Sequence, residues 1–324
     1  MQRLRTRLRV ALFAVINKLI KLKPFMAVFN YVYERASYSI VFLMNRHVKV
    51  PKMQYDWKIK LYNGKSIVTR IDMENEITMH VALGYKWHDI ALNLLENIIV
   101  DYLTEKHPNN SIYIDCGANL GMRSLTALSK NMKVVMIEPN DATNKINLER
   151  CKMNHFSNYE LLTYGVSDKD EQKSFYIDSS TYLSTLNEDI AKEDYITITN
   201  VSTIEVRKLD TIFADLIPKK TKAYIKMDIE GHEIEALNGA RKLIDEISPT
   251  FLIEINEKHE HILNIFADMR NKGYTIFEKT EPDASKKFLI KCPNDLLNYN
   301  FTSNDFLFVK DNAIIELIKS YECN

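Results

Sequence analysis

Cysteine is scarce in this sequence, and its four cysteines lie far from one another. They are Cys116, Cys151, Cys292 and Cys323, which form no Cys-x-x-Cys pair and no spacing typical of a metal site. This pattern favours neither a thiolate metal centre nor a disulfide framework. We therefore expect reduced thiols in a cytoplasmic protein.

Long hydrophobic runs are absent as well. The apolar stretch at 10–16 and a later one at 39–44 are too short to span a bilayer, which takes about 20 apolar residues. No convincing small-residue cleavage site follows the first stretch, so the pattern does not favour a signal peptide. The sequence predicts no transmembrane helix.

The sequence also has no internal repeat. Its 324 residues are 46% apolar and 10% aromatic, which excludes a collagen-like or a wholly disordered chain. At roughly 100–200 residues per domain, this length allows one large domain with an appendage, or two domains.

Acidic residues are rare in the first 70 positions, which hold 15 Lys and Arg but only Glu34 and Asp56. Because the whole chain is neutral, the remainder has an acidic excess of 13. A basic helix within residues 1–24 could contact anionic lipid at the cytoplasmic face of a membrane, or it could pack on the body or on a partner. The acidic body argues against nucleic acid as a partner.

Hydrophobic periodicity predicts an α/β protein. Alternation around Asn63-Gly64 predicts a β-hairpin, and helical spacing predicts a helix over 85–102. Apolar runs that alternate with helical stretches then predict a mostly parallel sheet with helices on both faces. The expected strands are 112–116, 134–138, 160–164, 223–228 and 251–255, with an antiparallel edge at 274–278 and 305–310.

We predict three parts of the chain. Residues 1–50 form a basic, helical N-terminal segment, 51–110 hold the hairpin and the helix that leads into the core, and 111–324 form the core domain. Within that domain, the polar stretch 167–210 is expected to contain extra strands or a lid near the site.

The most specific motif is Asp115-Cys-Gly-Ala-Asn-Leu-Gly121, where a buried strand is expected to turn into a helix. Glycine there allows close approach of a ligand, and we expect unpaired N–H groups at the start of the helix. The spacing is not Gly-x-Gly-x-x-Gly, and no Gly-Lys-Ser/Thr follows, so it favours neither a dinucleotide fingerprint nor a phosphate-binding loop.

Two further strand ends bear polar residues. Glu138-Pro139-Asn140 ends the second strand of the expected sheet, where a carboxylate could accept both hydroxyls of a ribose. Ser167 and Asp168 follow the third strand and could border an adenine ring, although Gly, Ser and Asp also form ordinary turns.

Together these motifs resemble the FkbM family of S-adenosylmethionine-dependent methyltransferases, over about residues 84–310. The most distinctive element is Lys226-x-Asp-x-Glu-Gly-x-Glu233, which Gly239-Ala240 follows. The matching segments are 114–121, 137–140, 166–168, 225–233, 237–240, 251–256 and 304–309.

The resemblance implies a class I methyltransferase fold, a Rossmann-like three-layer α/β structure. Its seven-stranded, mostly parallel sheet has an antiparallel last strand, and residues 111–324 would bind S-adenosylmethionine. By position, the loop after the first strand would line the methionine and ribose portions, Glu138 would hold the ribose, and Ser167 with Asp168 would border the adenine. The implied cofactor-binding set is Asp115, Gly117, Ala118, Asn119, Gly121, Glu138, Pro139, Asn140, Ser167 and Asp168.

The catalytic candidates lie in the same distinctive element. Strand alternation places Lys226 and Asp228 on one side of the strand. Asp228 is our first candidate for the base that takes a hydroxyl proton, followed by Glu230 and then His232. Lys226 could keep a carboxylate ionised or stabilise alkoxide charge, or it could form an ion pair that only shapes the strand end.

Two smaller questions stay open at this point. The sequence requires no metal, although Asp228, Glu230 and Glu254 could together suit Mg²⁺. Tyr85 or Trp87 could close the cofactor pocket, or either could be an ordinary core aromatic.

Family members generally methylate hydroxyl oxygens, often on sugars or on lipid-linked glycans. The resemblance therefore implies an O-methyltransferase with a small-molecule, glycan or glycolipid acceptor. An N-methyltransferase and a non-catalytic binding scaffold are the alternatives.

Overall fold

The computed structural model describes residues 54–61, 64–72, 90–179, 183–214, 217–218, 220–255, 259–279, 290–291 and 303–320, and isolated positions between 15 and 31. The chain divides into two compact units, Met1–Asp89 and Ile90–Asn324. The helix that we grouped with the hairpin therefore shares a unit with the core domain, and our finer boundaries at 50 and 110 stay predictions. The basic segment 1–24, apart from a few helical positions, lies outside the described residues, as do Tyr85 and Trp87.

The first unit contains the predicted hairpin. Strands β1 (Gln54–Lys60) and β2 (Ser66–Asp72) pair antiparallel, with Ile59 opposite Ile67. Gly64 has a φ of 80° in the turn, a conformation that suits glycine. The hairpin is confirmed.

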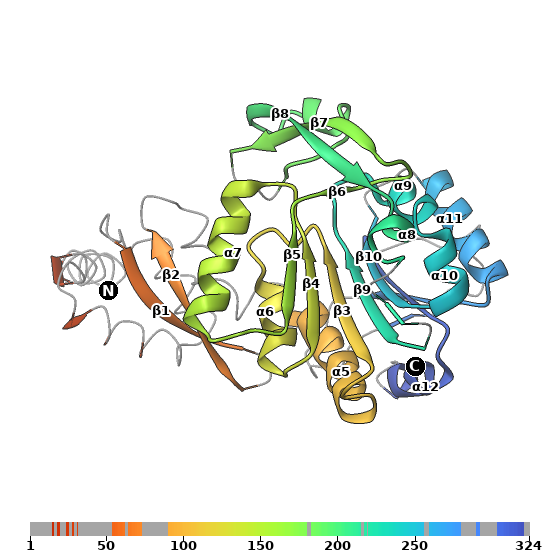
Figure 1. Cartoon of the computed structure of the whole chain (residues 1–324), viewed down its shortest axis with the longest axis horizontal. Coiled ribbons are helices and arrows are strands. Elements are labelled where there is room, and N and C mark those ends of the chain that lie inside the picture. Colours follow the sequence, from red (N-terminus) through yellow and green to blue (C-terminus); the bar gives the residue numbers. More distant parts are fainter. Residues whose placement is uncertain are drawn as a thin grey trace, which may run out of the picture. The chain divides into compact units, whose positions relative to one another are not determined.

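The second unit is built on an eight-stranded sheet of order β12-β11-β13-β10-β9-β3-β4-β5 (Figure 1). Strands β3, β4, β5, β9 and β10 are mutually parallel, whereas β13 runs antiparallel to both of its neighbours, β10 and β11. The strand bounds are β3 Ser111–Cys116, β4 Lys133–Ile137, β5 Tyr159–Leu162, β9 Lys222–Met227, β10 Thr250–Glu254, β11 Thr275–Lys279, β12 Ile290–Lys291 and β13 Asp305–Val309.

This strand order confirms the class I methyltransferase fold. Without the two-residue edge strand β12, seven strands remain, and the last of them in the chain is antiparallel and inserted between β10 and β11. The predicted strands agree with the observed ones to within one or two residues. The helix predicted over 85–102 is described from Ile90 to Lys106.

Helices pack on both faces of the sheet (Figure 1), and its central strands are therefore buried on both sides. The bounds are α5 Ile90–Lys106, α6 Met122–Ser129, α7 Asp141–Met153, α8 Leu209–Ile212, α9 Glu233–Asn238, α10 Arg241–Ile247, α11 His259–Asn271 and α12 Asn312–Lys319. All six residues of β3 are buried. Alternate β3 side chains point to opposite faces: Ile114 packs toward α8 and α10, and Tyr113 reaches Glu96 of α5.

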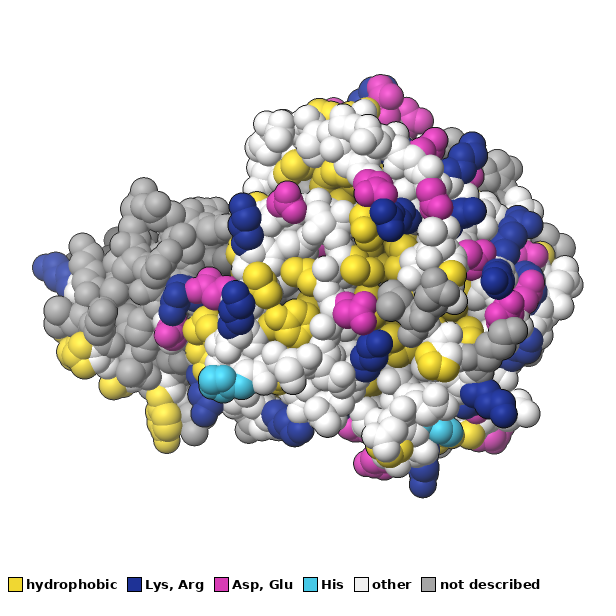
Figure 2. Space-filling model, viewed as in Figure 1, with side chains coloured by type: hydrophobic (Ala, Val, Ile, Leu, Met, Phe, Trp, Pro, Cys, Tyr) yellow, Lys and Arg dark blue, Asp and Glu magenta, His cyan; other side chains and the backbone are white. Residues whose placement is uncertain are grey.

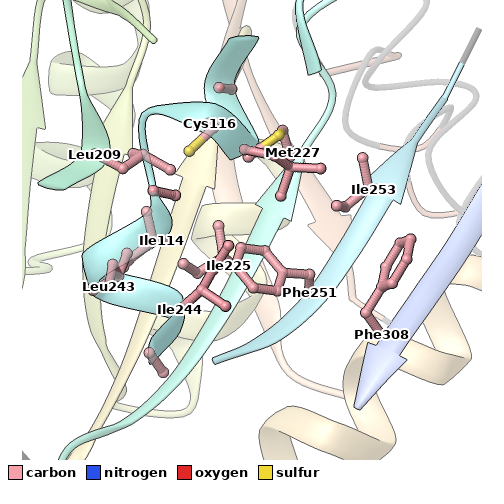
Figure 3. Packing of buried hydrophobic residues seen from close by; sticks show 14 of the residues in the cluster. Ile114, Cys116, Leu209, Ile225, Met227, Leu243, Ile244, Phe251, Ile253 and Phe308 are labelled. Atoms are coloured by element: carbon pink, nitrogen blue, oxygen red, sulfur yellow. The ribbon is translucent and has the colours of Figure 1, made fainter. Parts of the chain in front are cut away.

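A hydrophobic cluster of the described residues lies on one face of the sheet (Figure 3). There Ile114, Ile225 and Phe251 from three adjacent strands meet Leu209 of α8 and Ile244 of α10. This packing holds the central strands in register, and their carboxyl ends are therefore fixed relative to one another. No helix among the described residues is long and apolar enough to cross a membrane.

A separate three-stranded sheet of order β6-β8-β7 follows β5 (Figure 1). Its strands are β6 Gly165–Val166, β7 Glu171–Asp178 and β8 Ile198–Arg207, which confirms the extra strands expected in the polar stretch. The described part of the β7–β8 connection includes the short 3₁₀ helix η1, Ile190–Lys192. We call residues 183–192 of this connection the cap segment.

Candidate functional site

The loop after β3 is held close to the end of β9. Gly117 has a φ of 75°, and a Cβ atom there would lie 1.9 Å from the backbone oxygen of Asp228. Only glycine fits this position, because any side chain would displace the neighbouring backbone. Asn119 and Gly121 also have positive φ values, 44° and 67°.

Three N–H groups of the loop that precedes α6 already have acceptors within the protein. The unpaired N–H groups expected at the start of α6 itself stay a prediction. The N–H groups of Gly117 and Ala118 both donate to the Ile137 oxygen, at 3.0 and 3.1 Å. The Asn119 N–H donates to Glu138 Oε2 at 2.8 Å. These bonds tie the loop to the end of β4, because the two strands are parallel neighbours.

Glu138 is buried between the two loops. Its Oε1 accepts the Asn140 N–H at 2.8 Å, so each carboxylate oxygen has one backbone donor. Burial raises the pKa of Glu138 to about 7, although these two N–H groups oppose the shift. Each oxygen keeps a further acceptor position. This pair of acceptor oxygens therefore fits the two hydroxyls of a ribose, and the site is compatible with S-adenosylmethionine.

The other residues of that strand end shape the turn into α7. Asn140 is the N-cap of α7, and its Oδ1 accepts the Ala142 N–H at 3.0 Å. Pro139, between Glu138 and Asn140, has no N–H to continue a strand ladder. Direct contact of either residue with a cofactor stays a prediction.

Ser167 and Asp168 form a second group around His232. Ser167 is fully buried, and its Oγ lies 3.0 Å from His232 Nε2 and 3.3 Å from Asp168 Oδ1. Burial lowers the pKa of His232, against the opposing effect of Glu235. A Cβ atom at Gly239 would lie 2.1 Å from the Ser167 oxygen. The glycine of the Gly-Ala pair thus lets α9 pack directly on this loop.

Asp115 and Lys226 lie side by side in the register of β3 and β9. Asp115 Oδ2 accepts the Ser124 hydroxyl at 2.6 Å, and Oδ1 lies 3.8 Å from Lys226 Nζ. The Asp115 carboxylate is 1% exposed and therefore faces protein groups. Its predicted contact with the cofactor stays a prediction.

Lys226 and Asp228 form an ion pair at the end of β9, in which the lysine is buried and the aspartate is half-buried. Lys226 Nζ donates to Asp228 Oδ2 at 2.9 Å. Burial alone would lower the pKa of Lys226, but the Asp228 and Asp115 carboxylates outweigh it and raise that pKa. Burial would likewise raise the pKa of Asp228, yet Lys226 outweighs it and holds the pKa below its usual range. Both groups are charged at neutral pH.

Glu230 has a different environment although it is only two residues away. It adopts a left-handed conformation with a φ of 53°, which is uncommon for a residue other than glycine. Burial, and then repulsion from Asp228 and Glu254, raises the pKa of Glu230 to about 8. At neutral pH this carboxyl is mostly protonated, unlike Asp228.

Sequence reasoning missed the residues that hold the Glu230 turn. Thr185 Oγ1 donates to the Glu230 oxygen at 2.6 Å, and Asn187 Nδ2 donates to the Gly231 oxygen at 3.2 Å. A Cβ atom at Gly231 would lie 1.9 Å from Ile190 Cδ1. The cap segment is therefore packed on the turn. The only sequence signal was its place in the polar stretch between strands.

Glu233 holds the same turn from the other side. Its Oε1 accepts the N–H groups of Ile229 and Gly231 at 3.2 and 3.1 Å. Burial raises the pKa of Glu233 to about 8 despite these bonds. The motif spacing contained Glu233, but no role could be assigned to it before its contacts were known. Among the described residues, no group of three or more His, Cys, Asp and Glu is arranged to hold a metal ion.

The site thus has three carboxyl ends of adjacent strands in contact: the β3 loop, Glu138 after β4 and the turn after β9. In comparisons with known proteins, the Methyltransferase FkbM domain family matches residues 115–276, which span all three. The chain belongs to the FkbM methyltransferase family. As predicted from the sequence, it is a methyltransferase and its cofactor is S-adenosylmethionine. A search of curated proteins found no match.

Several solved structures are similar to this FkbM chain. A methyltransferase FkbM from Methylobacillus flagellatus KT shares 19% identity over 72% of this chain and 59% of its own, with a TM-score of 0.38. An rRNA methylase from Streptococcus thermophilus shares 12% over 67% and 93%, at 0.35. A putative methyltransferase from Streptococcus mutans in complex with SAH shares 12% over 65% and 94%, also at 0.35. The family assignment rests on the domain match and the strand order.

Proposed function

We propose that this chain is an O-methyltransferase that acts on a hydroxyl of a sugar, a glycan or a glycolipid. The observation that supports it is the pair of unlike carboxyls at the end of β9. Asp228 is ionised beside Lys226, whereas Glu230 has a pKa of about 8. A hydroxyl must lose its proton as the methyl group is transferred, whereas a neutral amine can attack through its lone pair. Transfer to a hydroxyl therefore requires a base whose pKa lies near the operating pH.

From the sequence we ranked Asp228 before Glu230 as the base. The contacts of the two residues favour the reverse order. A carboxylate with a low pKa, such as Asp228, is a weak base, while a carboxyl with a pKa near 8 is a stronger one once it is deprotonated. In our proposal Glu230 accepts the hydroxyl proton, and Asp228 orients the acceptor by accepting a hydrogen bond. Lys226 keeps Asp228 ionised and stabilises negative charge on the acceptor oxygen.

The cofactor side of the site is proposed to work by positioning. S-adenosylmethionine supplies a methyl group bound to a sulfonium. Glu138 would accept the ribose hydroxyls, Ser167 and Asp168 would border the adenine, and the β3 loop would lie beside the methionine portion. Alignment of the two reactants in this way can provide much of the rate acceleration.

The first experiment titrates the purified protein with S-adenosylmethionine and, in parallel, with NAD by calorimetry. We expect micromolar binding of S-adenosylmethionine, no binding of NAD, and loss of binding in Gly117→Arg, where the side chain would displace the Asp228 backbone. Absence of binding to the folded wild-type protein would refute the proposal. Binding without turnover on any acceptor would instead support the non-catalytic scaffold.

An amine acceptor is the second candidate, and a specific observation favours it. Asp228 and Glu254 lie close enough to Glu230 to raise its pKa, and a group of carboxyls attracts a cation when it is ionised. A panel of neutral glycans, glycolipids and amines, with methyl transfer measured at pH 7 and 8.5, separates the two candidates. Methylation of amines alone would replace the O-methyltransferase by an N-methyltransferase.

A further inference from the structure

Helix α7 turns polar side chains, instead of apolar ones, toward the protein interior. Its buried residues are Thr143, Asn144, Asn147, Arg150 and Cys151. Asn144, Asn147 and Arg150 recur every three residues and lie along one face of the helix. We call these three residues the donor stripe. A helix that packs on a sheet usually buries an apolar stripe, so this polar face needs a separate explanation.

Each residue of the donor stripe donates to a backbone carbonyl of the cofactor site. Asn147 Nδ2 donates to the Asn119 oxygen at 2.6 Å, and Arg150 Nη1 donates to the Leu120 oxygen. Asn144 Nδ2 donates to the Glu138 oxygen at 2.7 Å. The three acceptors belong to the two loops that the proposed cofactor would contact, and two of them are consecutive.

The loop that receives these bonds has a conformation that needs support. Asn119 has a φ of 44° although it is not glycine. At Gly121 a Cβ atom would lie 2.6 Å from Asn147 Oδ1, so the loop and the helix are in direct contact. Asn147 and Arg150 are each 1% exposed. Burial of such polar groups is unfavourable unless they are hydrogen-bonded.

We propose that Asn144, Asn147 and Arg150 are positioning residues that hold the β3 loop and Glu138 in the conformation that binds S-adenosylmethionine. This inference rests on the proposed cofactor site. The donor stripe acts through hydrogen bonds to backbone carbonyls of the two loops. Asn119 stays left-handed, its N–H remains directed at Glu138, and Glu138 keeps its place for the ribose.

Loss of the stripe has a defined consequence for binding. If the loop samples other conformations, only a fraction of the molecules can bind the cofactor. The apparent Kd is then the intrinsic Kd divided by that fraction. Association then slows, whereas dissociation from the properly formed complex changes little. A residue with only a structural role would lower stability without this kinetic pattern.

The test compares Asn147→Ala and Arg150→Met with Asn110→Ala. The side-chain amide of Asn110 also donates to a loop carbonyl, that of Lys220 at 2.8 Å, but at the opposite end of β3 and β9. S-adenosylhomocysteine is the probe. We expect a Kd at least ~10-fold weaker for both stripe variants, mostly through slower association, and a change below about 2-fold for the control.

Hydrogen exchange of residues 117–121 without ligand gives a second readout. We expect faster exchange in Asn147→Ala and unchanged exchange in Asn110→Ala. If Arg150→Met does not fold, Asn147→Ala decides. Wild-type Kd values and exchange rates in a folded Asn147→Ala protein would overturn the inference. If the wild-type protein itself does not bind the probe, the proposed function fails, and the exchange comparison still tests the stripe.

Discussion

At the scale of single residues, the pKa values of two carboxyls in the same motif are shifted in opposite directions. Asp228 lies 2.9 Å from the Lys226 ammonium, which outweighs the effect of burial on its pKa. Glu230 points from a left-handed turn into a region with other carboxyls, so burial and repulsion raise its pKa together. The difference results from neighbours and not from residue type.

The replacement Glu230→Gln tests the proposed base. Because a positioned base typically contributes 10²–10⁴-fold, methyl transfer should fall at least ~100-fold, while the Kd for S-adenosylhomocysteine stays within about 2-fold. In the wild-type enzyme the rate should rise between pH 6 and 8.5 as Glu230 loses its proton. Glu188→Gln, an exposed replacement in the cap segment, is the control. Full activity of Glu230→Gln would return the role of base to Asp228.

Glu138 should make cofactor binding depend on pH. Its pKa of about 7 lies above the ordinary value of 4.5, and ribose hydroxyls donate best to the ionised form. We expect S-adenosylhomocysteine to bind more tightly at pH 8 than at pH 6 and to release protons on binding. Glu138→Ala should weaken binding by at least ~1 kcal/mol and remove this pH dependence. Calorimetry in two buffers of different ionisation enthalpy measures both effects; unchanged binding would remove Glu138 from the ribose site.

At the scale of elements, the cap segment and α9 enclose the Glu230 turn from two sides. Thr185 and Asn187 bond its two carbonyls, and Glu233 accepts its N–H groups. Both left-handed residues of the turn, Glu230 and Gly231, are therefore held by the cap segment, which is distant in sequence, and by Glu233, which is close. This support explains how a strained conformation can persist at the site.

Replacement of Thr185 by Val removes one hydroxyl and nearly preserves shape. The Glu230 carbonyl then loses its donor in a buried environment, which should lower the free energy of unfolding by about 1–3 kcal/mol. Thr199→Val is the matched control, because the Thr199 hydroxyl donates to the Ile177 oxygen at 3.1 Å in an exposed part of the same sheet. Urea unfolding compares the two variants. Equal, small losses would contradict the role of Thr185, and Thr185→Ser should restore most of the stability.

At the scale of the whole molecule, charge is unevenly distributed along the chain but mixed over the body. Figure 2 shows acidic and basic side chains interspersed over the part that contains α8 to α11. The buried carboxyls are different, since several of them have raised pKa values. Their protonation links the stability of the fold to pH.

Stability should decrease as the pH rises from 6.5 to 8.5. Glu138, Glu230 and Glu233 have folded pKa values of about 7, 8 and 8, so they still hold protons where the unfolded chain has released them. Their stabilising contribution is complete below the unfolded value of about 4.5 and is lost as the pH rises through the folded values. His232, with a lowered pKa, adds no slope above its unfolded value of 6.5. Urea unfolding at four pH values measures the slope; Glu233→Gln should reduce it, and a rising stability would contradict the assignment.

The basic N-terminal segment should mediate contact with anionic membranes. Residues 1–24 hold seven Lys and Arg and no acidic residue. Their deletion should abolish sedimentation with phosphatidylserine vesicles, and salt should weaken the binding of the full chain because exposed charges are screened. Cofactor binding should be unchanged. Phosphatidylcholine vesicles are the control, and equal retention of the truncated protein would refute a membrane role.

Much of the fold follows from local patterns in the sequence. Apolar runs such as 112–116 and 134–138 predicted buried parallel strands, and Asn63-Gly64 predicted the hairpin, because both signals act over a few residues. The strand ends at Asp115, Glu138 and Asp228 could be placed at one edge of the sheet for the same reason, since parallel strands align their carboxyl ends. The ordered motifs then sufficed to predict the family.

The environment of each site residue was decided only by tertiary structure. The sequence ranked Asp228 above Glu230 because it cannot show that Lys226 pairs with the first and that Asp228 and Glu254 repel the second. The donor stripe of α7 was also missed, since Asn144, Asn147 and Arg150 read as an exposed polar face until their partner carbonyls are known. Local sequence determines which elements form and where their ends lie, whereas pKa values and loop conformations depend on groups that only packing brings together.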